Sequence, residues 1–321
     1  MNLRRKVLLG LGALAVSPKG TSQGKALRII VPFPVGGGTD VLARIVGEKL
    51  RGGYASTVLV ENRVGASGRI GVDAVKNADP DGGTLLFIPD FLLTVYPHSF
   101  RKLSYDPFAD FAAVAMVARS GLALSAGPAL PDSVRSISQY VDWARSNPKN
   151  AFFATTSPGG TPHFIGVMLA RDSGIALSPV HYKGGAPALQ DLLGERVASY
   201  FSAPPTALPQ IEAGNLIPLA TTGSIRPAYM PNIPTVAESG YPGFEALNWY
   251  AFVAPGKTPA PVLERWNLEI VKVLNDPGVK ESLDKHGLTP QPTTRAELTA
   301  FMRNEDAKWG AIVRERKITA D

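Results

Sequence analysis

Four short segments combine glycine, proline, serine and threonine in a way that is typical of loops that bind small anions. They are residues 33–40 (FPVGGGTD), 155–163 (TTSPGGTPH), 183–187 (KGGAP) and 202–206 (SAPPT). Glycine lets a ligand approach the backbone closely, and serine and threonine hydroxyls donate or accept hydrogen bonds. Where such a loop opens a helix, the first backbone N–H groups of the helix lack partners and favour a negative charge. The loops therefore predict a site for a small anion.

The elements around the first loop form a strand–helix–strand unit. Residues 27–33 (LRIIVPF) have no periodic polar face, which predicts a buried parallel strand. Thr39 is a candidate N-cap for a helix, and the apolar residues that follow recur at helical spacing, namely Val41, Leu42, Ile45, Val46 and Leu50. Residues 57–61 predict the next strand. Such a crossover builds a parallel sheet.

Strand and helix patterns alternate along the rest of the chain. Predicted strands cover residues 84–88, 114–117, 122–125, 151–154, 180–182, 197–201, 216–221 and 250–253. Predicted helices cover residues 73–77, 136–145, 163–173, 186–193, 206–213, 259–274, 279–286 and 295–316. The alternation predicts an α/β fold in which each of the four loops follows a strand and opens a helix. Ligands of open α/β sheets bind outside the carboxyl ends of the strands, where these loops would lie.

The chain of 321 residues is long enough for two domains. Two lobes suit the number of strands better than a single sheet of ten or more. We expect residues 25–117 and 223–321 to form lobe 1 and residues 118–222 to form lobe 2, with the last helices packed on lobe 1. The first and second loops would then face each other across a cleft between the lobes.

The N-terminal residues 1–22 have the pattern of a signal peptide followed by a flexible leader. Arg4, Arg5 and Lys6 precede the apolar residues 7–16, a run too short to span a membrane. Both the general route and twin-arginine export remain open. Loss of the three basic residues would lower the formal net charge from +6 to +3. No run of lysine or arginine occurs elsewhere in the chain, so the sequence does not predict nucleic-acid binding. The absence of cysteine excludes disulfides and thiolate metal sites.

Enzyme classes fit the motifs poorly. A nucleotide-binding Rossmann-like enzyme is the strongest alternative, because Glu61 follows the first glycine loop by about 20 residues. The loop lacks G-x-G-x-x-G, however, and Asp40 would repel a pyrophosphate. Residues 65–69 (GASGR) miss the G-x-S-x-G motif of a serine hydrolase. The four histidines are too scattered for a metal motif. We therefore expect a binding protein with no metal and no cofactor, and not an enzyme.

Six motifs in a fixed order resemble one family. They are residues 30–40 (IVPFPVGGGTD), 60–66 (VENRVGA), 79–82 (DPDG), 182–188 (YKGGAPA), 233–238 (IPTVAE) and 254–259 (APGKTP). Over residues 27–318 the chain resembles the Bug-type extracytoplasmic solute receptors of the tripartite tricarboxylate transporter family. The resemblance implies a periplasmic-binding-protein-like (Venus flytrap) fold, with parallel or mixed sheets flanked by helices, two lobes and a hinge.

The resemblance also implies a function. Such receptors hold a small organic carboxylate, here expected to be a dicarboxylate or an aromatic acid, and deliver it to a membrane permease or a sensor. We expect a periplasmic monomer. The ligand-binding residues implied are Phe33, Gly36, Gly37, Gly38, Thr39, Asp40, Thr156, Gly160, Thr161, His163, Gly184, Gly185, Ala186 and Ser202.

One departure from the family pattern bears on the ligand. Family members often carry an acid where this chain has Ser202, directly after Phe201. An acid there could pair with a ligand ammonium group, and serine cannot. The departure favours a ligand with a carboxylate and neutral or aromatic parts, and Phe33, Phe91 and Trp249 are candidates to stack on it.

Overall fold

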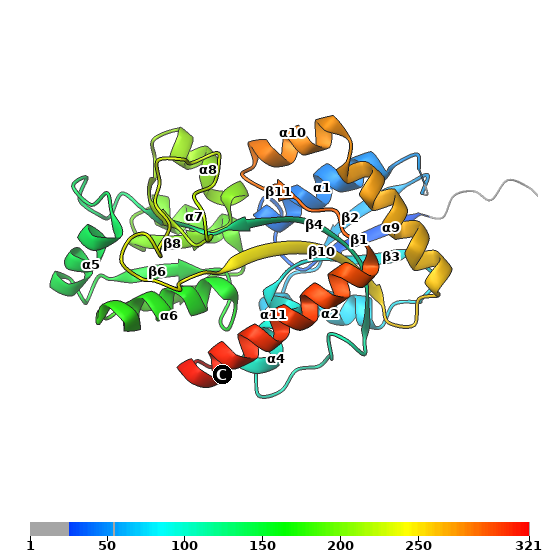
Figure 1. The fold of residues 1–321 in the computed structure, drawn as a ribbon, viewed down its shortest axis with the longest axis horizontal. Helices are drawn as coiled ribbons and strands as arrows, with labels where there is room; N and C mark the ends of the chain where they lie inside the picture. Colours follow the sequence, from blue (N-terminus) through cyan, green and yellow to red (C-terminus); the bar gives the residue numbers. More distant parts are fainter. Residues whose placement is uncertain (1–25, 54, 321) are drawn as a thin grey trace, which may run out of the picture.

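The computed structural model describes residues 26–53 and 55–320, which form two α/β lobes lying side by side (Figure 1). The predicted signal peptide, residues 1–22, lies outside the described residues. Within the described part of the chain, no helix combines the length and the apolar character needed to cross a membrane. The two-lobed, periplasmic-binding-protein-like fold predicted from the sequence is confirmed.

Lobe 1 is built on a six-stranded mixed sheet with the order β11-β4-β10-β3-β1-β2. Its strands are β1 (Leu27–Val31), β2 (Val58–Asn62), β3 (Thr84–Pro89), β4 (Phe111–Gly121), β10 (Leu247–Pro255) and β11 (Thr289–Pro290). Strands β1, β2 and β3 are parallel, while β10 runs antiparallel to β3 and β4. The central strands are apolar almost throughout because helices cover both faces of the sheet.

The helices of lobe 1 divide its core between the two faces of the sheet. They are α1 (Gly38–Leu50), α2 (Arg69–Lys76), α3 (Phe91–Thr94), α4 (Tyr96–Ser99), α9 (Ala260–Leu274), α10 (Pro277–Lys285) and α11 (Arg295–Arg316), with a 3-10 turn η1 (Ala66–Gly68) before α2. On one face Leu42 and Val46 of α1 pack with Trp266 of α9. On the other face Trp309 of α11 packs with Leu92 and Trp249.

Lobe 2 is built on a five-stranded sheet with the order β7-β6-β8-β5-β9. Its strands are β5 (Ala123–Ala126), β6 (Phe152–Thr155), β7 (Ser178–His181), β8 (Ser199–Ser202) and β9 (Ile217–Thr221). Its helices are α5 (Ile137–Ser146), α6 (Thr161–Ser173), α7 (Gly185–Leu193) and α8 (Pro204–Glu212). Strands β7, β6 and β8 are parallel, and α6, α7 and α8 each begin just after the carboxyl end of one of them. All four predicted loops thus connect a strand to a helix.

Sequence patterns located most elements within a few residues and missed a few. The predicted helix 295–316 coincides with α11, whereas the predicted strand 114–117 is the centre of the 11-residue strand β4. Residues 91–99 form the short helices α3 and α4, which were not predicted because neither is long enough to show a helical period. Thr39 is not the N-cap of α1, since Gly37 takes that position and Thr39 lies in the first turn.

Two chain crossings connect the lobes. Leu122 is the one residue between β4 and β5, and residues 222–246 connect β9 to β10. β4 continues in lobe 1 as far as Gly121, and Thr235 forms a bridge with Thr221 at the end of β9. The division of the chain at residues 117/118 and 222/223 stays a prediction.

Thr222 ties the two crossings together. Its hydroxyl accepts a hydrogen bond from the N–H of Leu122 (2.9 Å) and donates one to the carbonyl of Ala246 (2.5 Å). Its backbone N–H donates to the carbonyl of Leu122 (2.9 Å), and its carbonyl accepts from Ala246 (3.0 Å). Because Thr222 is fully buried, no water replaces these bonds if they are lost.

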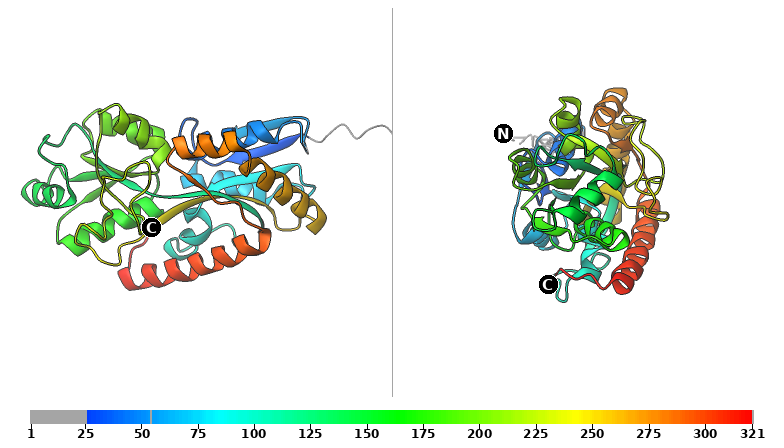
Figure 2. Two further views of the ribbon diagram at one scale, coloured as in Figure 1. Left: turned by 45° about the horizontal axis from the view of Figure 1, so that its top comes forward. Right: turned by 90° about the vertical axis from the view of Figure 1, so that its left-hand side faces the viewer.

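Helix α11 forms a third connection between the lobes. It packs on α3, α4 and β4 of lobe 1, and its second half reaches α6 of lobe 2 (Figure 2). The rings of Trp309 and Phe164 meet edge to face at 5.9 Å. At its end Arg316 forms an ion pair with Asp172 at 2.6 Å. The C-terminal helix therefore contacts both lobes.

The first prediction concerns the crossing. Thr222→Val keeps the volume of the side chain but leaves the N–H of Leu122 and the carbonyl of Ala246 without partners in a buried place. We expect the free energy of unfolding to fall by about 1–3 kcal/mol, measured by urea denaturation. Thr57→Val, on an exposed threonine, is the control and should change it by less than about 0.5 kcal/mol. Equal midpoints for the two variants would contradict this account of the crossing.

Candidate ligand pocket between the lobes

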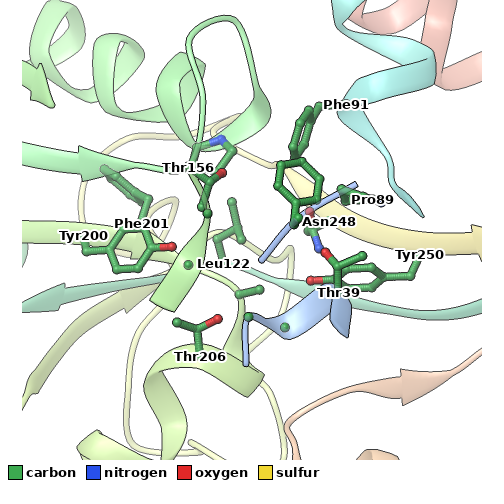
Figure 3. A pocket seen from close by; sticks show the side chains of 17 residues that line it. Thr39, Pro89, Phe91, Leu122, Thr156, Tyr200, Phe201, Thr206, Asn248 and Tyr250 are labelled. Carbon is green, nitrogen blue, oxygen red and sulfur yellow. The ribbon is translucent and has the colours of Figure 1, made fainter. Parts of the chain in front are cut away.

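A pocket with about 460 Å³ of empty space, including its open mouth, lies where the two lobes meet (Figure 3). Lobe 1 and the crossing at Leu122 contribute Phe33, Gly37, Gly38, Thr39, Pro89, Phe91, Leu122, Asn248 and Tyr250. Lobe 2 contributes Thr156, Pro162, Gly184, Gly185, Tyr200, Phe201, Ala203 and Thr206. None of these lining residues carries a charge. A charged ligand would therefore meet backbone amides, hydroxyls, the side-chain amide of Asn248 and apolar side chains, but no charged side chain of the lining.

The first glycine loop is held in place by Asp40, which does not line the pocket. The carboxylate of Asp40 accepts hydrogen bonds from the N–H of Gly36 (3.0 Å), from Arg44 (3.0 Å) and from Asn62 (2.8 Å). Asn62 also donates to the carbonyl of Phe33 at 2.9 Å. Burial acts to raise the pKa of the Asp40 carboxyl, but the three hydrogen bonds outweigh it and hold the pKa below its usual range. Asp40 is therefore a bracing carboxylate whose hydrogen bonds are already made within the protein.

The start of α7 meets this loop from the opposite lobe. Gly184, its N-cap, has a φ of +146°, a conformation that favours glycine. A Cβ at Gly184 would lie 2.7 Å from Cδ of Pro34 in the other lobe. A Cβ at Gly37 would lie 3.7 Å from the backbone nitrogen of Gly185. The lobes are thus closed on each other here, and glycine permits the contact.

Hydroxyl groups surround these two helix starts. A Cβ at Gly38 would lie 3.4 Å from the hydroxyl of Tyr250 and 3.5 Å from that of Thr206. A Cβ at Gly185 would lie 2.9 Å from the same Thr206 hydroxyl. In Figure 3 the side chains of Thr39 and Tyr250 lie together at the right of the pocket, and the side chain of Thr206 lies at its lower edge. Burial raises the pKa of the Tyr250 phenol, so this group stays a neutral donor. We call the part of the pocket around the starts of α1 and α7 the amide end of the pocket.

Asn248 adds a polar group to the lining that sequence analysis missed. It lies on β10 between apolar neighbours, is 3% exposed, and its amide nitrogen has no hydrogen-bond partner in the described structure. A buried donor without a partner is costly unless a ligand or water uses it. The signal that could have found it is a single asparagine within an otherwise apolar strand.

The second loop contributes less to the pocket than predicted. Thr156 lines it, whereas His163 braces the loop, because its Nδ1 accepts a hydrogen bond from the N–H of Gly159 at 3.1 Å. The His163 ring meets the His181 ring edge to face at 4.9 Å. Burial, with a smaller contribution from His181, lowers the pKa of His163 to about 4. The ring is thus neutral at pH 7, as its acceptor role requires.

The structure brings half of the predicted site residues together in the pocket lining. These are Phe33, Gly37, Gly38, Thr39, Thr156, Gly184 and Gly185. The others lie behind the lining or beside it, namely Gly36, Asp40, Gly160, Thr161, His163, Ala186 and Ser202. Trp249 also lies outside the lining and packs against Phe301 instead. Whether the lining residues contact a ligand stays a prediction.

Two α/β lobes that are joined by two chain crossings, with a pocket where the lobes meet, define the class of solute-binding proteins. The family model described as "Tripartite tricarboxylate transporter family receptor" matches residues 42–318, and the chain belongs to this family. It is 34% identical over 296 residues to Protein BugT of Bordetella pertussis. The match covers 92% of this chain and 90% of BugT. The chain is therefore a Bug-type receptor, and the comparisons give no support to a nucleotide-binding Rossmann-like enzyme.

Solved structures agree with this assignment. The structure titled "R. palustris Rpa4515 with adipate" has a TM-score of 0.88 and 29% identity, and the match covers 93% of this chain and 99% of that one. The periplasmic binding protein BugD has a TM-score of 0.86 and 29% identity over 92% of this chain and 98% of its own. MatC from Rhodopseudomonas palustris with bound malate has a TM-score of 0.83 and 26% identity, and the match covers 90% of this chain and 99% of MatC.

The contact between the lobes leads to a second prediction. In Gly184→Ala the new methyl group would clash with Pro34, so we expect the lobes to stay further apart than in the wild type. Small-angle X-ray scattering should give a larger radius of gyration for this variant.

Gly174→Ala is the matched control. Gly174 also has a positive φ (+65°), but a Cβ there would meet open space. Both variants place alanine in a backbone conformation that favours glycine and should lose about 1–3 kcal/mol of stability through strain, and only Gly184→Ala should change the radius of gyration. An unchanged radius in Gly184→Ala would contradict the closed contact as described.

Proposed function

We propose that the protein captures a small organic carboxylate in the pocket between its lobes. The observation that carries this proposal is the meeting of two helix starts, those of α1 and α7, at one end of a pocket whose lining has no charged side chain. The free N–H groups and the dipole of a helix start favour an anion. A carboxylate would need no cationic side chain there.

The ligands of the solved neighbours support the same class of ligand. Two of them are solved with adipate and with malate, both of which are carboxylates. The amide end of the pocket offers donors of the kind that a carboxylate accepts, namely the amides of Gly38 and Gly185 and the hydroxyls of Thr39 and Thr206. Asn248, with its unused amide nitrogen, is a further candidate donor.

The proposal includes how the receptor works. Residues 25–117 with 223–321 and residues 118–222 would close as two lobes about the crossings at Leu122 and Thr222. The predicted signal peptide 1–22 would direct the chain to the periplasm. There the protein would act as a monomer that delivers its ligand to a membrane permease or a sensor without turning it over.

A panel of ligands tests the proposed class of ligand. Small acids, including aliphatic and aromatic carboxylates, would be screened by thermal unfolding of the purified protein. A true ligand at 100 times its Kd stabilises the folded state by about 2.7 kcal/mol and raises Tm by several degrees. ATP and NAD serve as controls. A shift with a nucleotide and with no carboxylate would contradict the proposal.

Substitutions at Gly37 test the placement of the ligand. A Cβ at Gly37 makes only ordinary contacts, with no atom nearer than 3.6 Å, so Gly37→Ala should fold normally and bind slightly more weakly. Gly37→Val would fill space beside the start of α1, and we expect affinity for the carboxylate found in the panel to fall about tenfold or more. Titration calorimetry measures the affinity, and urea unfolding without ligand checks that stability is kept. Wild-type affinity in Gly37→Val would exclude this loop from the site.

A further inference from the structure

Asp90 is a buried acid at the interface between the lobes, directly behind the lining of the pocket. It follows β3 in lobe 1, is fully buried, and accepts a hydrogen bond at 2.6 Å from the hydroxyl of Thr161 in lobe 2. Its chain neighbours Pro89 and Phe91 line the pocket, and so does Pro162, which follows Thr161. The pair of Asp90 and Thr161 therefore closes the pocket on this side.

Thr161 is the first residue of α6, a 13-residue helix. The start of this helix is where the sequence predicted that lobe 2 would hold an anionic group of the ligand. The structure instead brings a carboxyl group of the protein itself to this place. The other carboxyl oxygen of Asp90, Oδ1, is buried and has no hydrogen-bond partner in the described structure. A ligand carboxylate that came to the start of α6 would have to share the space with Asp90.

The lining in front of Asp90 is apolar except for the amide of Asn248, which lies beside Phe91 in Figure 3. Phe91 meets Phe33 edge to face at 5.8 Å, and Leu122 and Phe201 line the same pocket. Figure 3 shows Phe91 on the opposite side of the pocket from Thr206. With Pro89 and Pro162 these side chains form what we call the apolar wall. A second ligand carboxylate against this wall would meet no cation and, apart from the Asn248 amide, no side-chain donor of the wall, which makes its burial unfavourable.

The geometry points to a receptor for ligands with a single carboxylate and an apolar body, because Asp90 occupies the place of a second ligand carboxylate at the start of α6. The carboxylate would lie at the amide end and the apolar body against the apolar wall. This inference rests on the proposed function and narrows it. The solved neighbours titled with adipate and malate hold diacids, so this chain would differ from them in ligand class.

Asp90 acts here mainly by filling space. Burial raises the pKa of Asp90 to about 8, and Glu305 of α11 adds to the rise by repulsion, while Thr161 opposes it. The group is therefore mostly neutral at pH 7. An asparagine has the same shape as the neutral acid, whereas an alanine leaves the space open. Asp90→Asn and Asp90→Ala thus separate the role of the shape from the role of the charge.

The test compares acids of equal length that differ only in the second carboxylate. Hexanoate is paired with adipate, butyrate with succinate, and 4-methylbenzoate with terephthalate, and each affinity is measured by titration calorimetry at pH 7. For the pair that contains the best ligand, the wild type should bind the monoacid about tenfold or more tightly than the diacid. A wild type that binds the diacid as tightly as the monoacid would overturn the inference.

The variants then test whether Asp90 is responsible. Asp90→Asn should keep the preference for the monoacid. Asp90→Ala frees the start of α6 and should shift the ratio of the two affinities towards the diacid by about tenfold. An unchanged ratio in Asp90→Ala would overturn the role of Asp90, and if that variant does not fold, the comparison on the wild type still decides. If no acid of the wider panel or of any pair binds the wild type, the proposed function itself fails, which is a different result.

Discussion

The close approach of α1 and α7 is the constraint on which the rest of the structure depends. The two helices begin within contact distance because Gly184, the N-cap of α7, has no side chain, since a Cβ there would lie 2.7 Å from Cδ of Pro34. The approach brings two sets of backbone donors to one end of the pocket. It also brings the lobes to a defined closed position, with Pro34 against Gly184 and Thr206 between Gly38 and Gly185.

This arrangement needs a rigid loop, and buried polar groups supply the rigidity. Asp40 is an acid at the start of a helix that carries donors for an anion, and it would compete with a ligand if it pointed into the pocket. It is turned away, and its carboxylate binds Gly36, Arg44 and Asn62. Thr222 has a comparable role at the crossings, where it joins three segments of the chain.

Sequence patterns could predict the fold and the glycine loops because those depend on local signals. Apolar runs and helical periods located the strands and helices, and glycine clusters located α1 and α7. The lining from β10 was not predictable in the same way, since Asn248 and Tyr250 reach the pocket only after β10 pairs with β3 and β4. Half of the predicted residues lie outside the lining for a related reason. Loop composition indicates that a loop is near a site, but hydrogen bonds such as that of His163 decide which way its side chains point.

The start of α6 illustrates this limit most clearly. Its glycines, threonine and histidine predict a second anchor for an anion as strongly as the first loop does, and nothing local distinguishes the two. The difference comes from Asp90, 71 positions away in the chain, whose side chain reaches Thr161 across the interface. An acid of the protein that already lies beside a helix start leaves little room there for a ligand carboxylate. The pocket is therefore asymmetric, with donors for an anion at one end and aromatic and proline side chains at the other.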